Sequence, residues 1–286
     1  MNFYVYMVLG YAILLGVNSV FKKKATANQK ESVVLVLYTG LSFALSLIWV
    51  PFGVGVQARF VGVLAFKGLI LAVSWFFVFR ILKSADVSIV SLSVALSSVI
   101  SLFAGVFLFG EGLACSQIVG TVIVVCGIVA INIVSYKERK KIEISHIIVL
   151  ILSAVFNAFS SIIDKYTASG TEFYQVQFWF LLFLFVFSLL FFIVDCLKSK
   201  EILIHKEDLK NYWVYLLALT LFIGDCLLFL SYRMPNASLV SITIISKFKT
   251  VVGVIIGAIV FKESNILLKI IISIIVVAGI LLVSLG

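Results

Sequence analysis

Residues 107–131 read FLFGEGLACSQIVGTVIVVCGIVAI, and residues 259–283 read IVFKESNILLKIIISIIVVAGILLV. Superposing the two stretches places Glu111 on Glu263, a shift of 152 residues, and the match continues without a gap back to Ala85. A weak internal repeat in a very hydrophobic chain is typical of secondary transporters that are built from two related halves.

The composition indicates an integral membrane protein. The chain has 286 residues, of which 63% are hydrophobic and 12% charged, whereas soluble domains carry about 25% charged residues. The apolar runs are continuous and about 20 residues long, so they predict helices rather than barrel strands. Breaks at charged residues, Pro and Gly place the expected spans at residues 3–21, 32–51, 62–82, 86–109, 113–134, 146–167, 174–195, 212–232, 237–261 and 265–285.

These ten spans divide into two units. The repeat predicts a first five-helix unit over residues 1–134, a charged linker over 135–145 and a second five-helix unit over 146–286. An odd number of crossings in each unit puts the second unit into the membrane upside down. The predicted fold class is therefore an all-α membrane protein of ten transmembrane helices in two inverted five-helix repeats.

Basic residues are distributed unevenly over the nine connections between the spans. The odd-numbered connections hold sixteen Lys and Arg residues, while the even-numbered ones hold only Arg59, Lys67, Lys165 and Arg233. The positive-inside rule then predicts a multi-pass protein of the plasma (inner) membrane with both termini outside. The net charge of +9 is explained by contact with an anionic inner leaflet, and nothing in the pattern indicates nucleic-acid binding.

Enzymatic and metal chemistry are not expected. The two histidines lie far apart, and none of the four cysteines forms a CxxC pair, so we expect neither a metal nor another cofactor. The sequence shows no nucleophile–base arrangement, no glycine-rich phosphate loop and no cluster of carboxylates.

Ionisable residues inside the spans indicate where a site lies, because such groups are costly in lipid and normally mark a pathway. Asp225 lies in the eighth span, and Lys247 and Lys249 lie in the ninth. At about 1.5 Å per residue, Asp225 is roughly 13 Å and Lys247 roughly 16 Å from the short turn around Met234 and Pro235. A pair between Asp225 and a lysine is either a structural ion pair or a substrate and proton site. Two residues apart on one helix, the lysines project about 200° from each other, so only one should line a central cavity.

Three further side chains are candidates for the site. Ser97 in the fourth span is the repeat equivalent of Lys249, although membrane serines often serve only packing. Asn157 in the sixth span can donate or accept hydrogen bonds. Trp75 in the third span provides either a flat wall for a ligand or lipid-facing bulk.

Two other groups of charged residues are expected to lie at helix ends. Asp164 and Lys165 are read as an adjacent ion pair at the membrane interface. Glu111 and Glu263 are read as markers of equivalent helix ends in the two halves.

The closing motifs FLFGE, residues 107–111, and IVFKE, residues 259–263, resemble those of the drug/metabolite transporter superfamily in its EamA-like branch. The stretch RILKSADVSIVSLSVALSSVISLFAGVFLFGE, residues 80–111, is similar to the same family's polar fourth helix. The resemblance implies inverted repeats around a central cavity that is lined largely by the first, third, fourth, sixth, eighth and ninth helices, and transport by alternating access. It says almost nothing about the substrate.

A second likeness concerns KTVV, residues 249–252, which is similar to the ninth-helix segment of nucleotide-sugar and sugar-phosphate translocators. It implies that Lys249 meets an anionic group. The chain departs from that pattern because its fourth helix has no lysine, which argues against a doubly charged phosphate. The outward termini also depart from the arrangement usual in the superfamily.

The sequence therefore predicts a secondary transporter of a small polar metabolite, with an anionic or zwitterionic molecule favoured. The expected substrate-binding residues are Lys249, Asp225, Trp75, Ser97 and Asn157, with Asp225 also the candidate for proton coupling. The expected partners are the small-molecule substrate, the lipid bilayer and a coupling proton or ion, and the chain is expected to be a monomer or a homodimer. The alternatives are an exporter of lipophilic cations or drugs, a lipid-carrier flippase and a non-transporting membrane partner subunit.

Overall fold

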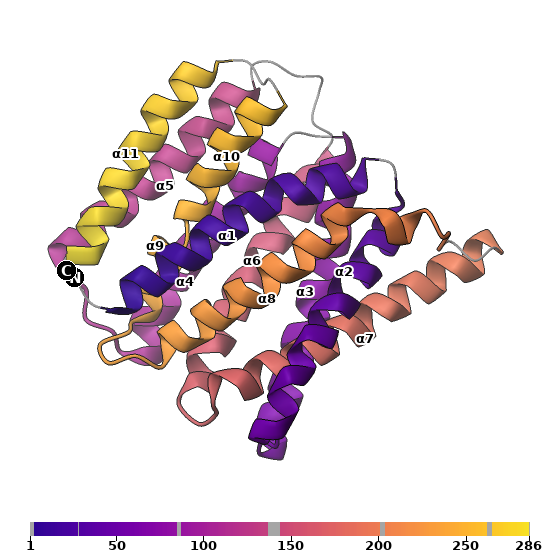
Figure 1. The fold of residues 1–286 in the computed structure, drawn as a ribbon. Coiled ribbons are helices and arrows are strands. Elements are labelled where there is room, and N and C mark those ends of the chain that lie inside the picture. Colours follow the sequence, from indigo (N-terminus) through magenta and orange to yellow (C-terminus); the bar gives the residue numbers. More distant parts are fainter. Residues whose placement is uncertain are drawn as a thin grey trace.

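The computed structural model describes residues 3–27, 29–84, 87–136, 144–200, 204–261 and 265–285, without the side chains of 82–84, 87–95, 132, 135–136, 144–147 and 285. Helices make up almost all of the described chain (Figure 1). They are α1 (Phe3–Thr26), α2 (Glu31–Ser46), α3 (Ala58–Ser84), α4 (Val87–Phe109), α5 (Cys115–Tyr136), α6 (Ile144–Ala168), α7 (Phe173–Ser199), α8 (Tyr212–Tyr232), α9 (Leu239–Ile245), α10 (Phe248–Val260) and α11 (Ile266–Leu285), with two short 3₁₀ helices, η1 (Leu47–Phe52) and η2 (Asp208–Lys210).

The structure confirms an all-helical membrane protein. Within the described residues, eight helical segments are long and apolar enough to cross a membrane, and two shorter apolar helices, Leu96–Phe109 and Cys115–Ile131, fall at the fourth and fifth expected spans. Two expectations are wrong in detail. The first helix runs on to Thr26, so Lys22, Lys23 and Lys24 belong to the helix. The ninth span consists of two helices, α9 and α10.

The helix contacts are arranged in matching sets between the two halves. α1 packs mainly against α8 and α10, and its counterpart α6 packs mainly against α3 and α4. α2 packs against α7, and α5 against α11 at one edge of the bundle (Figure 1). Such reciprocal contacts are expected of two copies related by an approximate two-fold axis. Most of the predicted linker, 135–145, lies outside the described residues, so its boundaries stay predictions.

The contact between α5 and α11 depends on small residues. A Cβ added to Gly120 would lie 2.5 Å from the carbonyl oxygen of Gly279, and one added to Gly127 would lie 2.4 Å from Val276 Cγ2. Lipid is as apolar as the helix surfaces, so membrane helices associate through such close approach rather than through a hydrophobic driving force. The close packing of α5 against α11 thus depends on the glycines at the centre of their contact.

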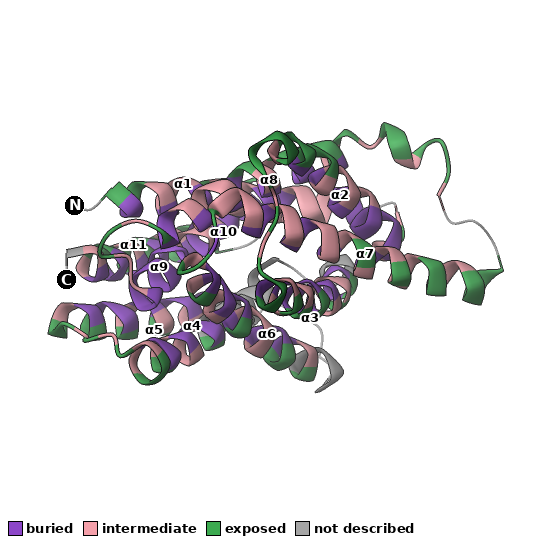
Figure 2. Ribbon diagram, turned by 90° about the horizontal axis from the view of Figure 1, so that it is seen from below, coloured by how far each residue is buried: buried purple, intermediate pink, exposed green. Residues whose placement is uncertain are grey.

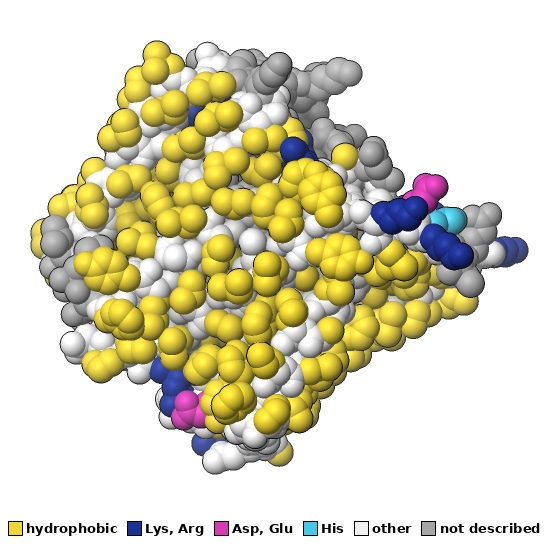
Figure 3. Space-filling view, viewed as in Figure 1, with side chains coloured by type: hydrophobic (Ala, Val, Ile, Leu, Met, Phe, Trp, Pro, Cys, Tyr) yellow, Lys and Arg dark blue, Asp and Glu magenta, His cyan; other side chains and the backbone are white. Residues whose placement is uncertain are grey.

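The outer surface is apolar and the interior holds polar groups. Exposed residues face outwards around the bundle (Figure 2), and hydrophobic side chains cover the face in Figure 3, with charged side chains gathered at two opposite margins. Phe107 and Leu267 are 79% and 73% exposed, while Lys67 is 2% exposed. This distribution is what a bilayer solvent requires. The chain is a multi-pass membrane protein, and both termini lie at the same end of the bundle (Figures 1 and 2).

Candidate functional site

A central cavity of about 230 Å³ lies between the two halves. Residues of α1, α3, α4, α6, α8, α9 and α10 line it, with Phe180 added from α7. The cavity is smaller than the sites of drug-sized ligands, which span about 300–1,000 Å³, so it suits a small metabolite. Six charged side chains reach it, which are Lys22, Lys67, Asp164, Asp225, Lys247 and Lys249.

All five residues proposed from the sequence line this one cavity. Lys249 comes from α10, Asp225 from α8, Trp75 from α3, Ser97 from α4 and Asn157 from α6. Both halves therefore contribute to the same space. The reading of Trp75 as lipid-facing bulk is wrong, because the indole lines the cavity and stacks on Tyr38 at 5.7 Å between ring centroids.

The ninth span is interrupted at the lysines. Ser246 Oγ donates to the carbonyl of Thr243 at 2.7 Å, which is the acceptor that the amide of Lys247 would use in a regular α-helix. That amide instead bonds the carbonyl of Ile244 at 3.0 Å. A serine that bonds back to its own helix competes with the α-helical ladder, so the turn tightens between α9 and α10 without any Pro or Gly.

This interruption overturns one expectation. Both Lys247 and Lys249 line the cavity, whereas a continuous helix would project them about 200° apart. The tightened turn changes the direction in which successive side chains point. It also puts Lys247 at the N-cap position of α10, where the positive end of the helix dipole adds to the charge of the two ammonium groups.

The two lysines have only neutral partners within the described part of the chain. Lys247 Nζ donates to Ser97 Oγ at 3.2 Å, and Lys249 Nζ donates to Tyr11 Oη at 3.2 Å. Lys247 is 5% exposed. A buried ammonium without a counter-charge is costly, so these two groups are poised to accept an anion.

Asp225 is buried on α8 and is 5% exposed. Its Oδ2 atom has no hydrogen-bond partner among the described residues. The sequence suggested an ion pair between Asp225 and a lysine of the ninth span, because the two lie at similar depth. Asp225 takes part in none of the ion pairs among the described residues, so this pair is not formed. The carboxylate is therefore free to interact with a ligand or a proton.

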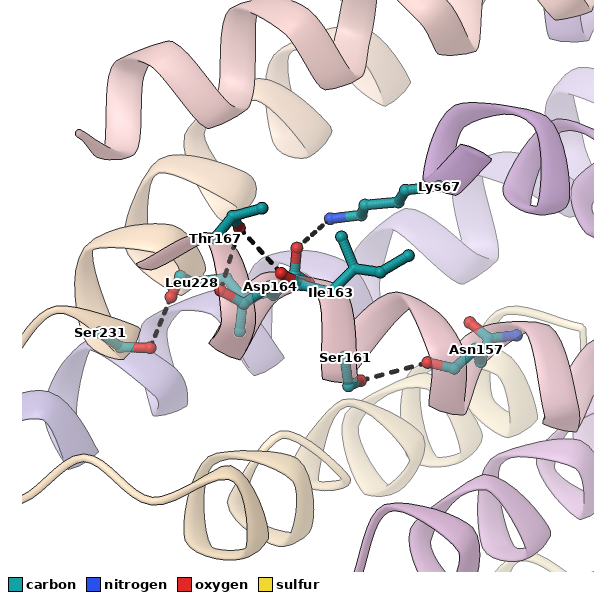
Figure 4. A network of polar contacts seen from close by, with 8 residues as sticks. All are labelled: Lys67, Asn157, Ser161, Ile163, Asp164, Thr167, Leu228 and Ser231. Carbon is teal, nitrogen blue, oxygen red and sulfur yellow. Dashed lines mark hydrogen bonds and ion pairs between the residues drawn. The ribbon is translucent and has the colours of Figure 1, made fainter. Parts of the chain in front are cut away.

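The buried ion pair of the cavity joins Lys67 and Asp164, with exposed fractions of 2% and 4% (Figure 4). The Lys67 ammonium also lies 4.2 Å from the ring centroid of Phe180 and 4.5 Å from that of Phe229. Two sequence readings are wrong here. Lys67 belongs to the interior of α3 rather than to a connection, and Asp164 does not pair with Lys165. The sequence signal for the interior position of Lys67 was its place within the apolar run VLAFKGLILAV, residues 63–73.

Asn157 is held mainly by its own helix. Its Nδ2 donates to the carbonyl of Ser153 at 2.6 Å, and its carbonyl accepts from Ser161 Oγ at 3.2 Å (Figure 4). The hydroxyls of Ser153 and Ser74 lie 2.7 Å apart. This chain of polar groups links α6 to α3 along one wall of the cavity.

Lys22 was not singled out from the sequence as a site residue. It lines the cavity from the last turns of α1, and its Nζ lies 4.7 Å from the ring centroid of Trp75. The sequence analysis used the run of three lysines mainly as a signal of membrane topology. Lys22 is assigned to the cavity only because α1 continues to Thr26 in the structure.

The cavity is not equally accessible at its two ends. Tyr11 on α1 and Lys67 on α3 are buried, whereas Lys22 and Trp75, further along the same helices, are partly exposed. Both helices run away from the end of the bundle that holds the termini. The more accessible end is therefore the one opposite the termini.

Glu111 joins the two halves at the terminal end. Its Oε1 accepts from the amide of Leu239 at 2.5 Å and its Oε2 from the amide of Val240 at 3.1 Å, so the carboxylate sits at the N-terminus of α9. Lys165 Nζ lies 3.7 Å from Glu111 and also donates to the carbonyl of Ala237. Glu111 follows the end of α4 as expected, but its partner helix could not be foreseen. Its repeat equivalent, Glu263, lies outside the described residues.

Comparison with known proteins agrees with this architecture. Residues 2–133 match the model of the EamA-like transporter family. This part of the chain is similar to EamA-like transporters. A solved structure described only as "Crystal structure of protein" is 17% identical, with a TM-score of 0.75 over 100% of this chain and 98% of that chain, and it is one of 27 matching chains. At that identity the likeness concerns the fold alone. No curated protein matches the chain.

The helices that line the cavity are those that the resemblance implied, with Phe180 of α7 in addition. The shared arrangement of helices accounts for the frame of the site. The charged groups within it have to be interpreted from their own geometry.

Proposed function

We propose that this protein is a secondary transporter that carries a small anionic or zwitterionic metabolite across the plasma membrane by alternating access. The observation that carries the proposal is the pair of ammonium groups of Lys247, which is buried, and Lys249, which is partly buried, lining a cavity that also holds the carboxylate of Asp225, which forms no ion pair among the described residues. Ionisable groups inside a membrane protein normally mark substrate and ion pathways.

Each charged group has a proposed role. Lys249, assisted by Lys247 and the N-terminus of α10, binds a carboxylate or phosphate group of the substrate. Asp225 binds an amino group of the substrate or exchanges the coupling proton. Trp75, Ser97 and Asn157 complete the walls and restrict the size of the substrate.

Alternating access is supported by the difference between the two ends of the cavity. The end near the termini is bridged by Glu111 and Lys165, and the opposite end is the more accessible one. If the termini lie outside, as the distribution of basic residues predicts, the structure corresponds to a state that opens towards the cytoplasm.

The proposal is tested by ligand-induced thermal stabilisation of the purified protein, followed by uptake into proteoliposomes. A specific ligand raises the apparent stability by mass action, so a panel of metabolite classes identifies the binding class. Lys249→Ala should weaken binding of an anion at least about tenfold, as expected for the loss of a charge-assisted contact. Stabilisation by no small molecule, together with no uptake, would contradict the proposal.

Proton coupling is tested by Asp225→Asn. If Asp225 carries the proton, a proton gradient should drive uptake by the parent and have no effect on the variant. Gradient-insensitive uptake by both proteins would remove the coupling role of Asp225 and leave its substrate-binding role to be tested by affinity.

An exporter of lipophilic cations is the alternative within transport, because Asp225 is an unpaired carboxylate in a partly aromatic cavity. The lysines of the same cavity oppose it. Improved transport of a lipophilic cation by Lys249→Ala would favour this alternative over an anionic substrate.

A further inference from the structure

The cavity carries an excess of positive charge. Among the described residues that line it, four lysines face two aspartates. Lys67 and Asp164 neutralise each other in their buried pair. Three ammonium groups, those of Lys22, Lys247 and Lys249, therefore remain against the single carboxylate of Asp225. With all of these groups ionised, the described lining residues carry two more positive charges than negative ones.

Lys22 occupies an aromatic box at the more accessible end of the cavity. Its Nζ lies 4.7 Å from the ring centroid of Trp75, 5.6 Å from that of Phe79 and 5.8 Å from that of Tyr38. No carboxylate of the described chain lies within ion-pair distance of it. Aromatic faces attract a cation without neutralising it, so the box holds the ammonium in place while leaving its charge available.

The two neighbouring lysines are placed differently. Lys23 Nζ lies 4.4 Å from the ring centroid of Phe261, and Lys24 Nζ lies 4.5 Å from that of Trp213. Neither lysine lines the cavity. All three residues make an aromatic contact, and of these consecutive residues only Lys22 combines that contact with the cavity wall.

We propose that Lys22 is a second anion-binding residue and that the substrate carries two negative charges, as in a small dicarboxylate or a phosphate monoester. This inference rests on the proposed transport function and narrows it to a class of substrate. One anionic group binds at Lys247 and Lys249 beside the α10 N-terminus, and the remaining negative charge is met by Lys22. Such a substrate neutralises the excess charge of the cavity.

The size of the cavity agrees with a compact substrate. The cavity volume of about 230 Å³ lies below the range of sites for drug-sized ligands. A compact dianion of the size of succinate or glycerol phosphate is small enough for such a space. The fourth helix lacks a lysine, and α1 supplies the additional charge instead.

The experiment compares dianions with matched uncharged or singly charged probes at neutral pH. The probes are succinate against butyrate, and glycerol phosphate against glycerol, each tested by thermal stabilisation of the purified full chain and by uptake into proteoliposomes. We expect succinate or glycerol phosphate to bind at least about tenfold more tightly than its matched probe, since each charge-assisted contact has about that effect. The two pairs distinguish a dicarboxylate from a phosphate monoester.

Variants of the lysine run test the residue itself. Lys22→Gln should remove most of the preference for the dianion, lowering its affinity about tenfold while leaving that of butyrate within about twofold. Lys24→Gln is the matched control, because it removes the same charge and an aromatic contact two residues along the same helix, and it should keep the preference. Lys22→Arg keeps the charge and should retain the preference. This variant distinguishes the loss of the charge from a folding defect caused by any substitution at this position.

The outcomes separate this inference from the function on which it rests. Binding and uptake of monoanions or zwitterions without any preference for dianions would overturn the two-anion substrate and leave the transporter in place. An equal loss of preference in Lys22→Gln and Lys24→Gln would overturn the role of Lys22. Absence of binding and uptake for every class would overturn both proposals.

Discussion

Breaking the Lys67–Asp164 pair should destabilise the protein strongly. Asp164→Asn leaves the Lys67 ammonium, 2% exposed, without a counter-charge, and breaking a buried pair in this way costs about 3–5 kcal/mol. The rings of Phe180 and Phe229, at 4.2 and 4.5 Å, still stabilise the ammonium by about 1–2 kcal/mol in total. We therefore expect the lower end of the range, about 3 kcal/mol.

Removing both charges should reverse most of that loss. The double variant Lys67→Met/Asp164→Leu replaces the pair by apolar groups, a change that is often neutral for buried ion pairs. Its free energy of unfolding should lie within about 1–2 kcal/mol of that of the parent. Arg233→Gln is the control, because the Arg233–Glu172 pair at 2.8 Å is partly exposed and such pairs contribute less than about 1 kcal/mol.

The assay is unfolding of the purified variants in detergent micelles, by denaturant and by heat. At roughly 2–4 °C per kcal/mol for a chain of this size, Asp164→Asn should lower the Tm by about 6–12 °C. The reasoning is refuted if Asp164→Asn changes stability no more than Arg233→Gln does, or if the double variant is as unstable as the single one. In the first case the pair would be weakly coupled to the fold, and in the second its side chains would be required for packing.

Three other predictions concern the closure of the cavity, the packing of the bundle and the topology. Glu111→Ala removes two hydrogen bonds to the α9 N-terminus, each worth about 1.5–3 kcal/mol, and should increase labelling of Tyr232→Cys from the terminal side by an impermeant thiol reagent. Unchanged labelling would argue against a closing role. Gly120→Ala, whose Cβ would lie 2.5 Å from the Gly279 carbonyl, should cost about 1–3 kcal/mol, whereas Gly257→Ala, with nothing within 4 Å, should be nearly neutral in the same unfolding assay. A reporter that is active only outside the cytoplasm should be active when it is fused to the carboxyl terminus. If a reporter that is active only in the cytoplasm is active at that position instead, the proposed orientation is reversed.

Much of the architecture could be predicted from local patterns. Continuous apolar runs of about 20 residues indicate helices because a bilayer leaves the backbone no other way to satisfy its hydrogen bonds. The cavity-lining positions of Asp225 and Lys249 could be predicted too, because a charged group in such a run has to face the interior, whereas Trp75 was left between a cavity wall and lipid-facing bulk. Their roles in binding stay predictions.

What could not be predicted depends on partners distant in the sequence. Lys67 was assigned to a connection because it lies near the start of its expected span, and its partner, Asp164, lies 97 residues away. Glu111 binds the N-terminus of α9 through the amides of Leu239 and Val240, which lie 128 and 129 residues further along the chain. No local pattern carries such pairings, since they arise when the two halves pack on each other.

The sequence by itself therefore determined the helical membrane class, the two-part organisation and which residues are too polar for lipid. The tertiary structure decided how those polar residues are combined: Lys67 with Asp164, Lys247 and Lys249 on one wall, and Lys22 in an aromatic box within reach of the cavity. The physical reason is that hydropathy acts on each segment alone, whereas the net charge of a cavity is a sum over helices that meet only in the folded chain.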